Sequence, residues 1–313
     1  MSKIKPQITF IVTCGFYYPQ SQGIIDQIEE TQPVEKIELI IIEPDELSYS
    51  LKRSEKFAKV FSIKYKNYDI HSSQLEAIKR SDTNIVVLLE DHSILRNNLA
   101  DELINTFNSG DYAAVGISND PLDKGYTSIA GYVLSYGKFH SSFDSFETKD
   151  YLAPNNLAYN KKDIIGLLNK PLIASQILLQ KKLLAAGKKF FFTSNTGIIH
   201  FQYVKYSRFV KTLFYSGWMY AVQNGKTNNF SFFSKVFYAF AVFGKPYIRL
   251  YQLREILKYH SKYFKLNYSF LSITLFSALA VSSLGETIGY LFGEGKTVFH
   301  FSVLETKHDR NEK

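Results

Sequence analysis

The sequence has little of what marks several protein classes. Its single cysteine, Cys14, permits no internal disulfide, which fits a reducing compartment. The apolar run at residues 8–14 is too short for a signal peptide or a membrane span, so we expect this part of the chain in the cytosol. The sequence has no internal repeat and no low-complexity linker. With 45% apolar residues among 313, it is long and apolar enough for one large core or two units, which excludes a disordered chain.

Acidic residues are almost missing from residues 201–265, where Glu255 stands against eleven lysines and arginines. This segment therefore carries +10, and because the whole chain carries +8, the remainder sums to −2. The segment also holds 20 of the 49 aromatic residues. Cations interleaved with aromatic rings suit an anionic lipid surface or single-stranded nucleic acid. An apolar segment follows directly, which favours lipid, and we expect no nucleic-acid partner.

Short apolar runs alternate with amphipathic segments, which predicts an α/β fold with a mostly parallel sheet and flanking helices. We expect strands at residues 8–14, 38–42, 60–65, 85–89, 112–117 and 189–193. We expect helices at residues 21–30, 50–59, 72–81, 99–107, 125–136 and 171–186, with a further one from residue 161. Ser21 is placed to cap the first of these helices. Residues 140–150 form a polar loop that could serve as a lid or bind an acceptor.

Three metal-competent side chains follow the apolar run at residues 85–89, namely Glu90, Asp91 and His92. In open α/β sheets, ligands bind beyond the carboxyl ends of the strands, so the position of this cluster indicates a site. Alternate side chains of a strand share a face, so Glu90 and His92 can point together while Asp91 points away. Oxygen ligands suit Mg²⁺ or Mn²⁺, and an imidazole shifts the preference toward Mn²⁺. The alternative is a strand followed by a solvated turn.

Two further polar residues end apolar runs. Glu43 closes the expected strand at residues 38–42, either as a second carboxylate of the site or as a surface acid before a turn. His200 ends the run TGIIH, as His92 ends its own. A single histidine is usually structural, but two at strand ends of one α/β domain favour a shared site.

The order of these signals resembles glycosyltransferase family 2, the nucleotide-sugar-dependent enzymes with the GT-A fold. The resemblance covers residues 8–225 and depends on several short motifs in the family's order. These are ITFIVTCG, ELIIIE, VVLLEDH at the place of the Asp-x-Asp metal motif, VGISND, APNNLAY, LLAAGKKFFF and the strand ending IIH.

The resemblance implies a UDP- or GDP-sugar donor held through Mn²⁺ or Mg²⁺ at the carboxyl edge of the sheet. Glu90, His92 and His200 would be the metal ligands, with Glu90, Asp91 and His200 also on the donor and Asp91 as a catalytic residue. Two residues remain of the expected set: Glu43 matches the acid that contacts the nucleoside, and Asn156 matches a polar residue of the acceptor side. Cys14, at the end of the opening strand, completes the set expected to bind the donor.

The sequence departs from the family in two places. His92 replaces the second aspartate of the metal motif, which keeps a ligand but changes its charge. The neutral residues Ala174, Ser175 and Gln176 occupy the neighbourhood in which inverting members carry the general base. Asp150, with Asp144 as a second choice, could take the proton instead. Otherwise the chain binds a nucleotide sugar or a partner without turnover.

The carboxyl-terminal part is expected to be helical and membrane-associated. We place a domain of the GT-A type at residues 1–225 and a basic, aromatic and apolar helical region at residues 226–313. Residues 266–292 contain one charge, Glu286, and are long enough for a span, although several serines weaken it. We expect monotopic or re-entrant attachment to anionic lipid at the cytoplasmic face, with one span as the alternative. Core helices of a second soluble unit are the third interpretation. If the region is attached to the membrane, the acceptor would be a lipid-linked saccharide or another envelope glycan.

Overall fold

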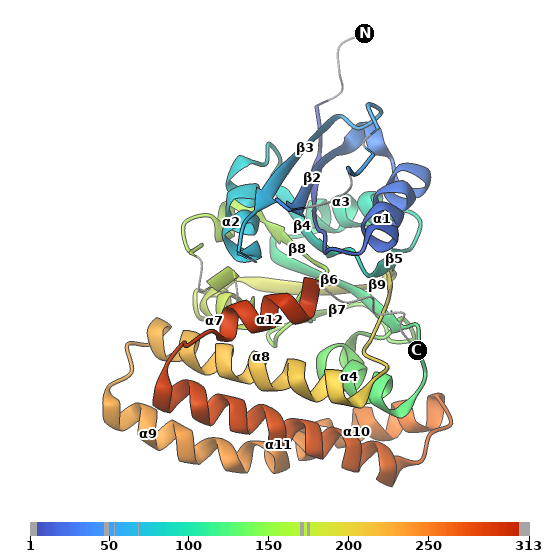
Figure 1. Ribbon diagram of the computed structural model, residues 1–313. Coiled ribbons are helices and arrows are strands. Elements are labelled where there is room, and N and C mark those ends of the chain that lie inside the picture. The colour runs from blue at the N-terminus through green and yellow to red at the C-terminus, as the bar shows by residue number, and fades with distance from the viewer. Residues whose placement is uncertain are drawn as a thin grey trace. The chain divides into compact units, whose positions relative to one another are not determined.

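The computed structural model describes residues 5–46, 50–52, 54–67, 69–169, 172–173 and 176–306 (Figure 1). The chain forms two compact units. The first comprises the residues up to Asp120 together with Phe139–His200, and the second comprises Pro121–Lys138 and Phe201–Glu305. Gly225, where we expected the first domain to end, lies within a helix of the second unit, α8 (Tyr206–Thr227).

The first unit contains one mixed sheet. Its strands are β1 (Ile8–Thr13), β2 (Ile37–Pro44), β3 (Lys59–Tyr65), β4 (Ile85–Glu90), β5 (Ser93–Leu95), β6 (Tyr112–Pro121), β7 (Phe146–Thr148), β8 (Leu157–Asn160) and β9 (Lys189–His200). The strand order is β3-β2-β1-β4-β8-β6-β9-β5, and β7 pairs with β9. The strands β3, β2, β1 and β4 are parallel, whereas β8 is antiparallel to β4 and β6, and β5 and β7 are antiparallel to β9. The predicted α/β fold is confirmed.

Helices flank both faces of this sheet. They are α1 (Tyr18–Thr31), η1 (Val34–Lys36), α2 (Ile70–Arg80), α3 (Leu99–Ser109), α5 (Lys161–Ile164) and α7 (Gln176–Ala185), and η2 (Gly137–Phe139) joins the two units. The main core forms where α1 and α3 pack on alternate residues of β1, β2 and β4, such as Phe10, Leu39 and Val87. Helix α2 contacts β1, β2 and β3 on the opposite side of the sheet (Figure 1). Four adjacent parallel strands therefore end at the same edge of a sheet whose two faces are covered by helices.

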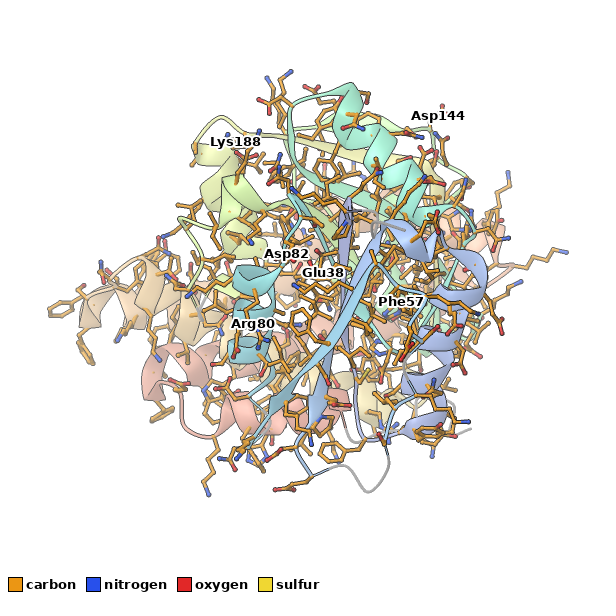
Figure 2. All side chains as sticks on the ribbon, turned by 90° about the horizontal axis from the view of Figure 1, so that it is seen from above. Glu38, Phe57, Arg80, Asp82, Asp144 and Lys188 are labelled. Atoms are coloured by element: carbon orange, nitrogen blue, oxygen red, sulfur yellow. The ribbon has the colours of Figure 1, made fainter. Side chains whose placement is uncertain are left out.

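A buried carboxylate fixes the amino-terminal ends of these strands. Glu38 is fully buried and accepts hydrogen bonds from Thr9 Oγ1 at 2.6 Å and from the backbone N–H of Asp82 at 2.7 Å. Its other oxygen lies 2.8 Å from Lys59 Nζ, and Lys59 also pairs with Asp82. Glu38 and Asp82 are labelled in Figure 2. This network accounts for a buried charge at the edge of the sheet that is remote from the predicted site.

Several element boundaries differ from the sequence predictions. The helix expected at residues 50–59 is absent from the described part of that range, where Leu51 and Phe57 are buried. The segment from residue 161 makes only the four-residue α5, and β9 continues through the expected break to His200. Within the helix expected at residues 171–186, the structure describes helical residues at 172–173 and the helix α7 (Gln176–Ala185). Ala174 and Ser175 lie outside the described residues.

The second unit is helical. Its helices are α4 (Tyr126–Ser135), α8 (Tyr206–Thr227), α9 (Phe232–Ala241), η3 (Val242–Gly244), α10 (Lys245–Tyr263), α11 (Tyr268–Phe292) and α12 (Thr297–Thr306). Helix α11 packs closely on α8, since a Cβ at Gly285 would clash with the carbonyl oxygen of Phe214 and one at Gly289 would lie 2.5 Å from that of Trp218. Buried Glu286 of α11 pairs with Lys245 of α10. One face of α11 is therefore internal to this unit.

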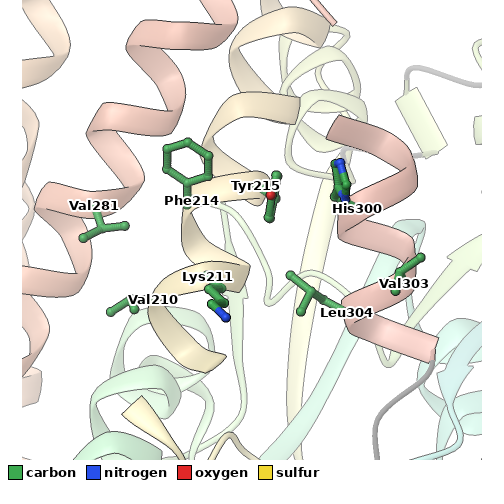
Figure 3. A pocket seen from close by; sticks show the side chains of 8 residues that line it. All are labelled: Val210, Lys211, Phe214, Tyr215, Val281, His300, Val303 and Leu304. Carbon is green, nitrogen blue, oxygen red and sulfur yellow. The ribbon is translucent and has the colours of Figure 1, made fainter. Parts of the chain in front are cut away.

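An apolar cavity of about 410 Å³ lies between α8, α11 and α12 (Figure 3). Valine, leucine and aromatic side chains line it, and Lys211 and His300 are its basic groups. None of the lining residues that the structure describes is a carboxylate, and Tyr215 stacks on His300 with ring centroids 5.2 Å apart. Among the described residues, a group of side chains that could hold a metal ion lies in the first unit.

Candidate metal centre

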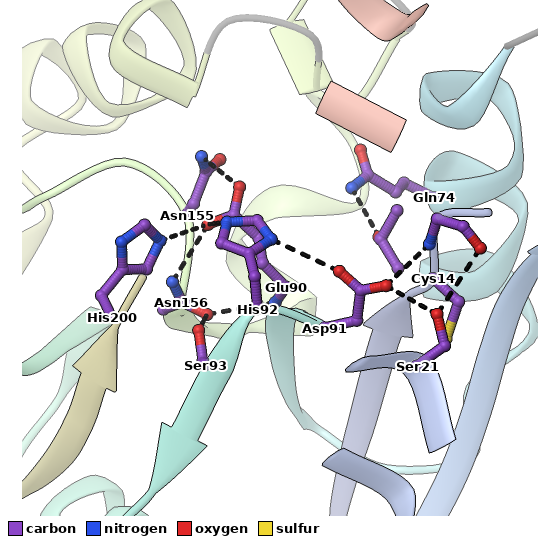
Figure 4. Close-up of polar contacts among 12 residues, drawn as sticks. Cys14, Ser21, Gln74, Glu90, Asp91, His92, Ser93, Asn155, Asn156 and His200 are labelled. Carbon is purple, nitrogen blue, oxygen red and sulfur yellow. Dashed lines mark hydrogen bonds and ion pairs between the residues drawn. The ribbon is translucent and has the colours of Figure 1, made fainter. Parts of the chain in front are cut away.

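The carboxyl edge of the first unit brings Glu90, His92 and His200 together (Figure 4). Glu90 ends β4, and His92 follows it by two residues. His200 ends β9, and the antiparallel register of β5 and β9 sets it opposite Ser93. Glu90 Oε2 lies 3.0 Å from His200 Nε2 and 3.3 Å from His92 Nε2. The imidazole rings meet edge to face, with their centroids 4.9 Å apart.

These distances fit a divalent metal ion. One ligand atom from each of the three side chains can be chosen so that all lie within 4.8 Å of one another. Adjacent ligands of an octahedral ion at about 2.1 Å stand roughly 3 Å apart, which matches the spacing around Glu90 Oε2. One carboxylate and two imidazoles suit Mn²⁺ and other first-row ions better than Mg²⁺. The three residues thus have both the donor chemistry and the spacing of a metal centre.

Electrostatics keep Glu90 ionised. Burial alone would raise its pKa, but the charge of His92 and hydrogen bonds from His200 and His92 outweigh burial, and they hold the pKa well below its usual range. Both imidazoles are almost completely buried, with side-chain exposures of 6% for His92 and 3% for His200, whereas Glu90 retains 19%. A carboxylate ligand is therefore available at neutral pH.

Asp91 points away from Glu90, as the alternation along the strand predicts. Its Oδ2 accepts hydrogen bonds from the backbone N–H of Gly15 at 2.8 Å and from Ser21 Oγ at 2.7 Å. Its Oδ1 lies 3.3 Å from His92 Nδ1, on the far side of the ring from Glu90. Such a carboxylate orients a metal-ligating histidine from behind. The predicted helix-capping role of Ser21 was wrong, because α1 begins at Tyr18 and the Ser21 hydroxyl serves Asp91.

Cys14 and Glu43 lie at the same edge of the sheet but outside the group of three. Cys14 is fully buried, and its carbonyl accepts a hydrogen bond from Tyr65 Oη at 3.1 Å. Glu43 is the last residue but one of β2, is 3% exposed and accepts a hydrogen bond from Ser62 Oγ at 2.8 Å. Since β1 separates β2 from β4, two strand spacings put Glu43 about 10 Å from Glu90.

Two consecutive asparagines support Glu90. Asn155 Nδ2 donates to Glu90 Oε1 at 2.8 Å, and Asn156 Nδ2 donates to Oε2 at 3.2 Å. Asn156 Oδ1 accepts from the backbone N–H of Glu90 at 3.1 Å, so this residue, expected on the acceptor side, lies beneath the metal ligand. Both have positive φ values, 62° and 43°, in the left-handed region that asparagine tolerates. The sequence analysis missed the contribution of Asn155, although Asn-Asn after a proline is a signal for such a turn.

The two acids expected as alternative bases lie in the exposed segment before β8. The backbone N–H of Asp150 donates to Thr148 Oγ1, and its Oδ1 accepts from the N–H of Tyr151 at 2.8 Å. Asp144 is exposed and lies in the loop before β7 (Figure 2).

No protein-family model and no curated protein sequence matches the chain. Among solved structures, it is similar to the crystal structure of GalNAc-T7 with UDP, GalNAc and Mn²⁺, with 10% identity and a TM-score of 0.45 over 64% of this chain and 44% of that one. It is also similar to S. aureus TarS 1–349, with 8% identity and a TM-score of 0.47 over 88% and 90% of the two chains. The chain spans less than half the length of the GalNAc-T7 chain. Likenesses of this strength assign neither a fold family nor an activity to the chain.

Proposed function

We propose that the first unit is a metal-dependent glycosyltransferase of the GT-A type that uses a UDP- or GDP-sugar. The observation that carries the proposal is the meeting of Glu90, His92 and His200 at the carboxyl edge of four parallel strands. Nucleotide ligands bind at this edge in open α/β sheets. The order of the sequence motifs, which resembles family 2, supports the same function.

Each residue of the edge has a role in this proposal. Glu90, His92 and His200 hold Mn²⁺ or Mg²⁺, which would supply positive charge to the diphosphate leaving group. Asp91 orients His92 through its Nδ1, and it ties the turn after β1 to β4. Glu43 contacts the nucleoside from β2, beside the turn that follows Cys14. Asp150, in the segment before β8, takes the proton of the acceptor hydroxyl.

The second unit attaches the protein to the cytoplasmic face of a membrane in this proposal. A stripe of aromatic side chains at intervals of three or four residues runs along the consecutive helices α9, η3 and α10. Their exposed fractions are 82% for Phe233, 68% for Phe237, 70% for Phe240, 49% for Phe243, 68% for Tyr247 and 67% for Tyr251. A contiguous apolar stripe of this kind is unusual on a soluble monomer and marks an interaction surface. We call it the aromatic stripe.

The chemistry of this surface favours anionic lipid as the partner. Lysines and arginines such as Lys235, Arg249 and Lys258 lie on the same helices, and each basic residue near an anionic leaflet contributes about 1 kcal/mol. Helix α11 is long and apolar enough to cross a membrane, with a mean hydropathy of 1.5. Its buried Glu286 and its glycine contacts with α8 instead favour a packing role, so we propose attachment in the plane of the membrane. A lipid-linked or other envelope glycan is the acceptor class that fits this attachment.

The function is tested by measuring nucleotide release from a panel of UDP- and GDP-sugars with Mn²⁺ and with EDTA. We expect Mn²⁺-dependent release with one donor, and its loss in Glu90→Gln, whose folding is checked by its melting temperature. Donor binding without release in the presence of saccharide acceptors would favour the alternative, a binding protein without turnover. Glu76→Gln, an exposed carboxylate on α2, is the matched control.

A further inference from the structure

Helix α7 begins with Gln176, one of three neutral residues in the neighbourhood where the family resemblance places a carboxylate. Its side chain is 6% exposed. Gln176 Oε1 accepts a hydrogen bond from the backbone N–H of Asn155 at 3.2 Å, and Nε2 donates to Asn155 Oδ1 at 3.1 Å. Tyr159 Oη also lies 3.3 Å from Oε1. The carboxamide is thus held at both ends by one residue, Asn155.

Chemistry fixes the orientation of every group in this chain of contacts. A backbone N–H can only donate, so the oxygen of Gln176 must face it, and the amide nitrogen of Gln176 then faces Asn155 Oδ1. Asn155 consequently turns its own N–H toward Glu90 Oε1, at 2.8 Å. An ionised carboxylate can only accept, so donors and acceptors match from Gln176 to Glu90.

Because these contacts hold Glu90 Oε1, the other oxygen, Oε2, points toward the two histidines. Asn155 occupies Oε1, while Oε2 faces His92 Nε2 and His200 Nε2 and receives a weaker bond from Asn156. Asn155 lies in a turn and has a φ of 62°, and this backbone conformation points its side-chain amide at Glu90 Oε1. The rotation of the carboxylate is therefore set by Asn155 at Oε1, the shorter bond, together with Asn156 at Oε2.

We propose that Gln176 and Asn155 are positioning residues for the metal ligand Glu90. This inference rests on the proposed metal centre and deepens it. A glutamate at position 176 would lose the N–H that Asn155 Oδ1 accepts, and it would face that oxygen with a negative charge. The amide of Gln176, and not a carboxylate, therefore fits the contacts that hold Asn155 against Glu90.

The test compares Gln176→Ala and Gln176→Glu with Gln180→Ala by calorimetric titration of the purified full chain with Mn²⁺. Gln180 lies one turn along the same helix, is fully buried and bonds the backbone N–H and carbonyl of Leu152 at 2.8 and 3.3 Å. We expect both Gln176 variants to lose roughly 10–100-fold in Mn²⁺ affinity, as substitutions behind a metal ligand do. Gln180→Ala should lower the melting temperature while Mn²⁺ affinity and the electron paramagnetic resonance spectrum of bound Mn²⁺ stay as in the wild type.

A second variant separates this path from general loosening of the fold. Asn155→Gly keeps a residue suited to positive φ and removes only the side-chain amide. It should weaken Mn²⁺ binding as much as Gln176→Ala, and the double variant should be no weaker than either, because the two residues act in series. Equal affinity losses in Gln176→Ala and Gln180→Ala, additive losses in the double variant, or a wild-type chain that binds none of Mn²⁺, Mg²⁺ and Zn²⁺ would each overturn the proposal. Tight Mn²⁺ binding with no nucleotide release would sink the transferase function alone.

Discussion

His200 Nε2 lies 3.0 Å from Glu90 Oε2, although 110 residues separate the two side chains. The strand β5 directly follows the segment that carries Glu90 and His92, and β9 pairs antiparallel with β5. This pairing brings His200, at the end of β9, next to Glu90. His200 and Glu90 are both largely buried, so removing either side chain would leave the other without a partner that water replaces, which costs free energy.

His200→Ala should therefore remove most of the metal affinity. We expect the Mn²⁺ dissociation constant to rise by more than the roughly 10–100-fold typical of residues behind the ligands. Calorimetric titration measures it. The control is His71→Ala, which removes another buried histidine of the first unit, on α2. Equal affinities of these two variants would contradict the assignment of His200 as a ligand.

Asp91→Asn should destabilise the first unit even without metal. Two donors, the N–H of Gly15 and the hydroxyl of Ser21, bond to one charged oxygen, and such bonds contribute about 1.5–3 kcal/mol. We expect the free energy of unfolding in urea with EDTA to fall by about that amount, and by less in Ser21→Ala. A loss seen only when Mn²⁺ is present would instead make Asp91 a direct ligand.

Cys14 gives a pH dependence of stability. Burial raises the pKa of its thiol well above the usual value, and the negative charge of Asp91 adds to the effect. In the unfolded chain the thiol ionises from about pH 8.5 while the folded chain keeps its proton, so the unfolding free energy falls with rising pH by up to about 1.4 kcal/mol per unit. Urea unfolding from pH 8 to 10 should show this slope in the wild type and less of it in Cys14→Ala. Rapid reaction of the native thiol with a disulfide reagent at neutral pH would count against it.

The aromatic stripe should govern vesicle binding. Complete burial of one phenylalanine contributes about 1.5–3 kcal/mol, so replacing Phe233, Phe237 and Phe240 by serine should weaken binding to phosphatidylserine-containing vesicles at least roughly tenfold. Co-sedimentation with vesicles measures this, and Phe146→Ser, which alters a 38% exposed ring in the first unit, is the control. If the triple variant bound vesicles normally but lost a dimer in sedimentation analysis, the stripe would be a contact between copies of this chain.

Packing of α11 on α8 can be tested in the same protein. Gly285→Ala would force a methyl group against the carbonyl of Phe214, and overpacking of this kind costs about 1–3 kcal/mol. Gly23→Ala in α1 has open space around it and should be neutral or stabilising. We expect only Gly285→Ala to lower the melting temperature. A neutral outcome at Gly285 would favour a free α11 that spans the membrane.

Local sequence patterns predicted the strands because buried parallel strands are short, continuous apolar runs, as at β4. They also placed Glu90 and His92 on one side, which needs only the alternation of a strand. The error at residues 50–59 came from charged residues such as Lys56, which pairs with Glu29 of α1 rather than with a helical neighbour. Gln176 was read only as a missing base, because its partner Asn155 lies 21 residues earlier and meets it through tertiary structure.

The order in which the ribosome makes this chain has a consequence for the metal centre. Glu90 and His92 emerge early, whereas His200 emerges after eight of the nine strands have been made. A nascent chain that stops before β9 lacks one of the three side chains of the proposed metal centre, so the complete ligand set would exist only late in synthesis. A fragment cut before residue 189 would therefore keep much of the sheet sequence and still be unable to acquire the ion.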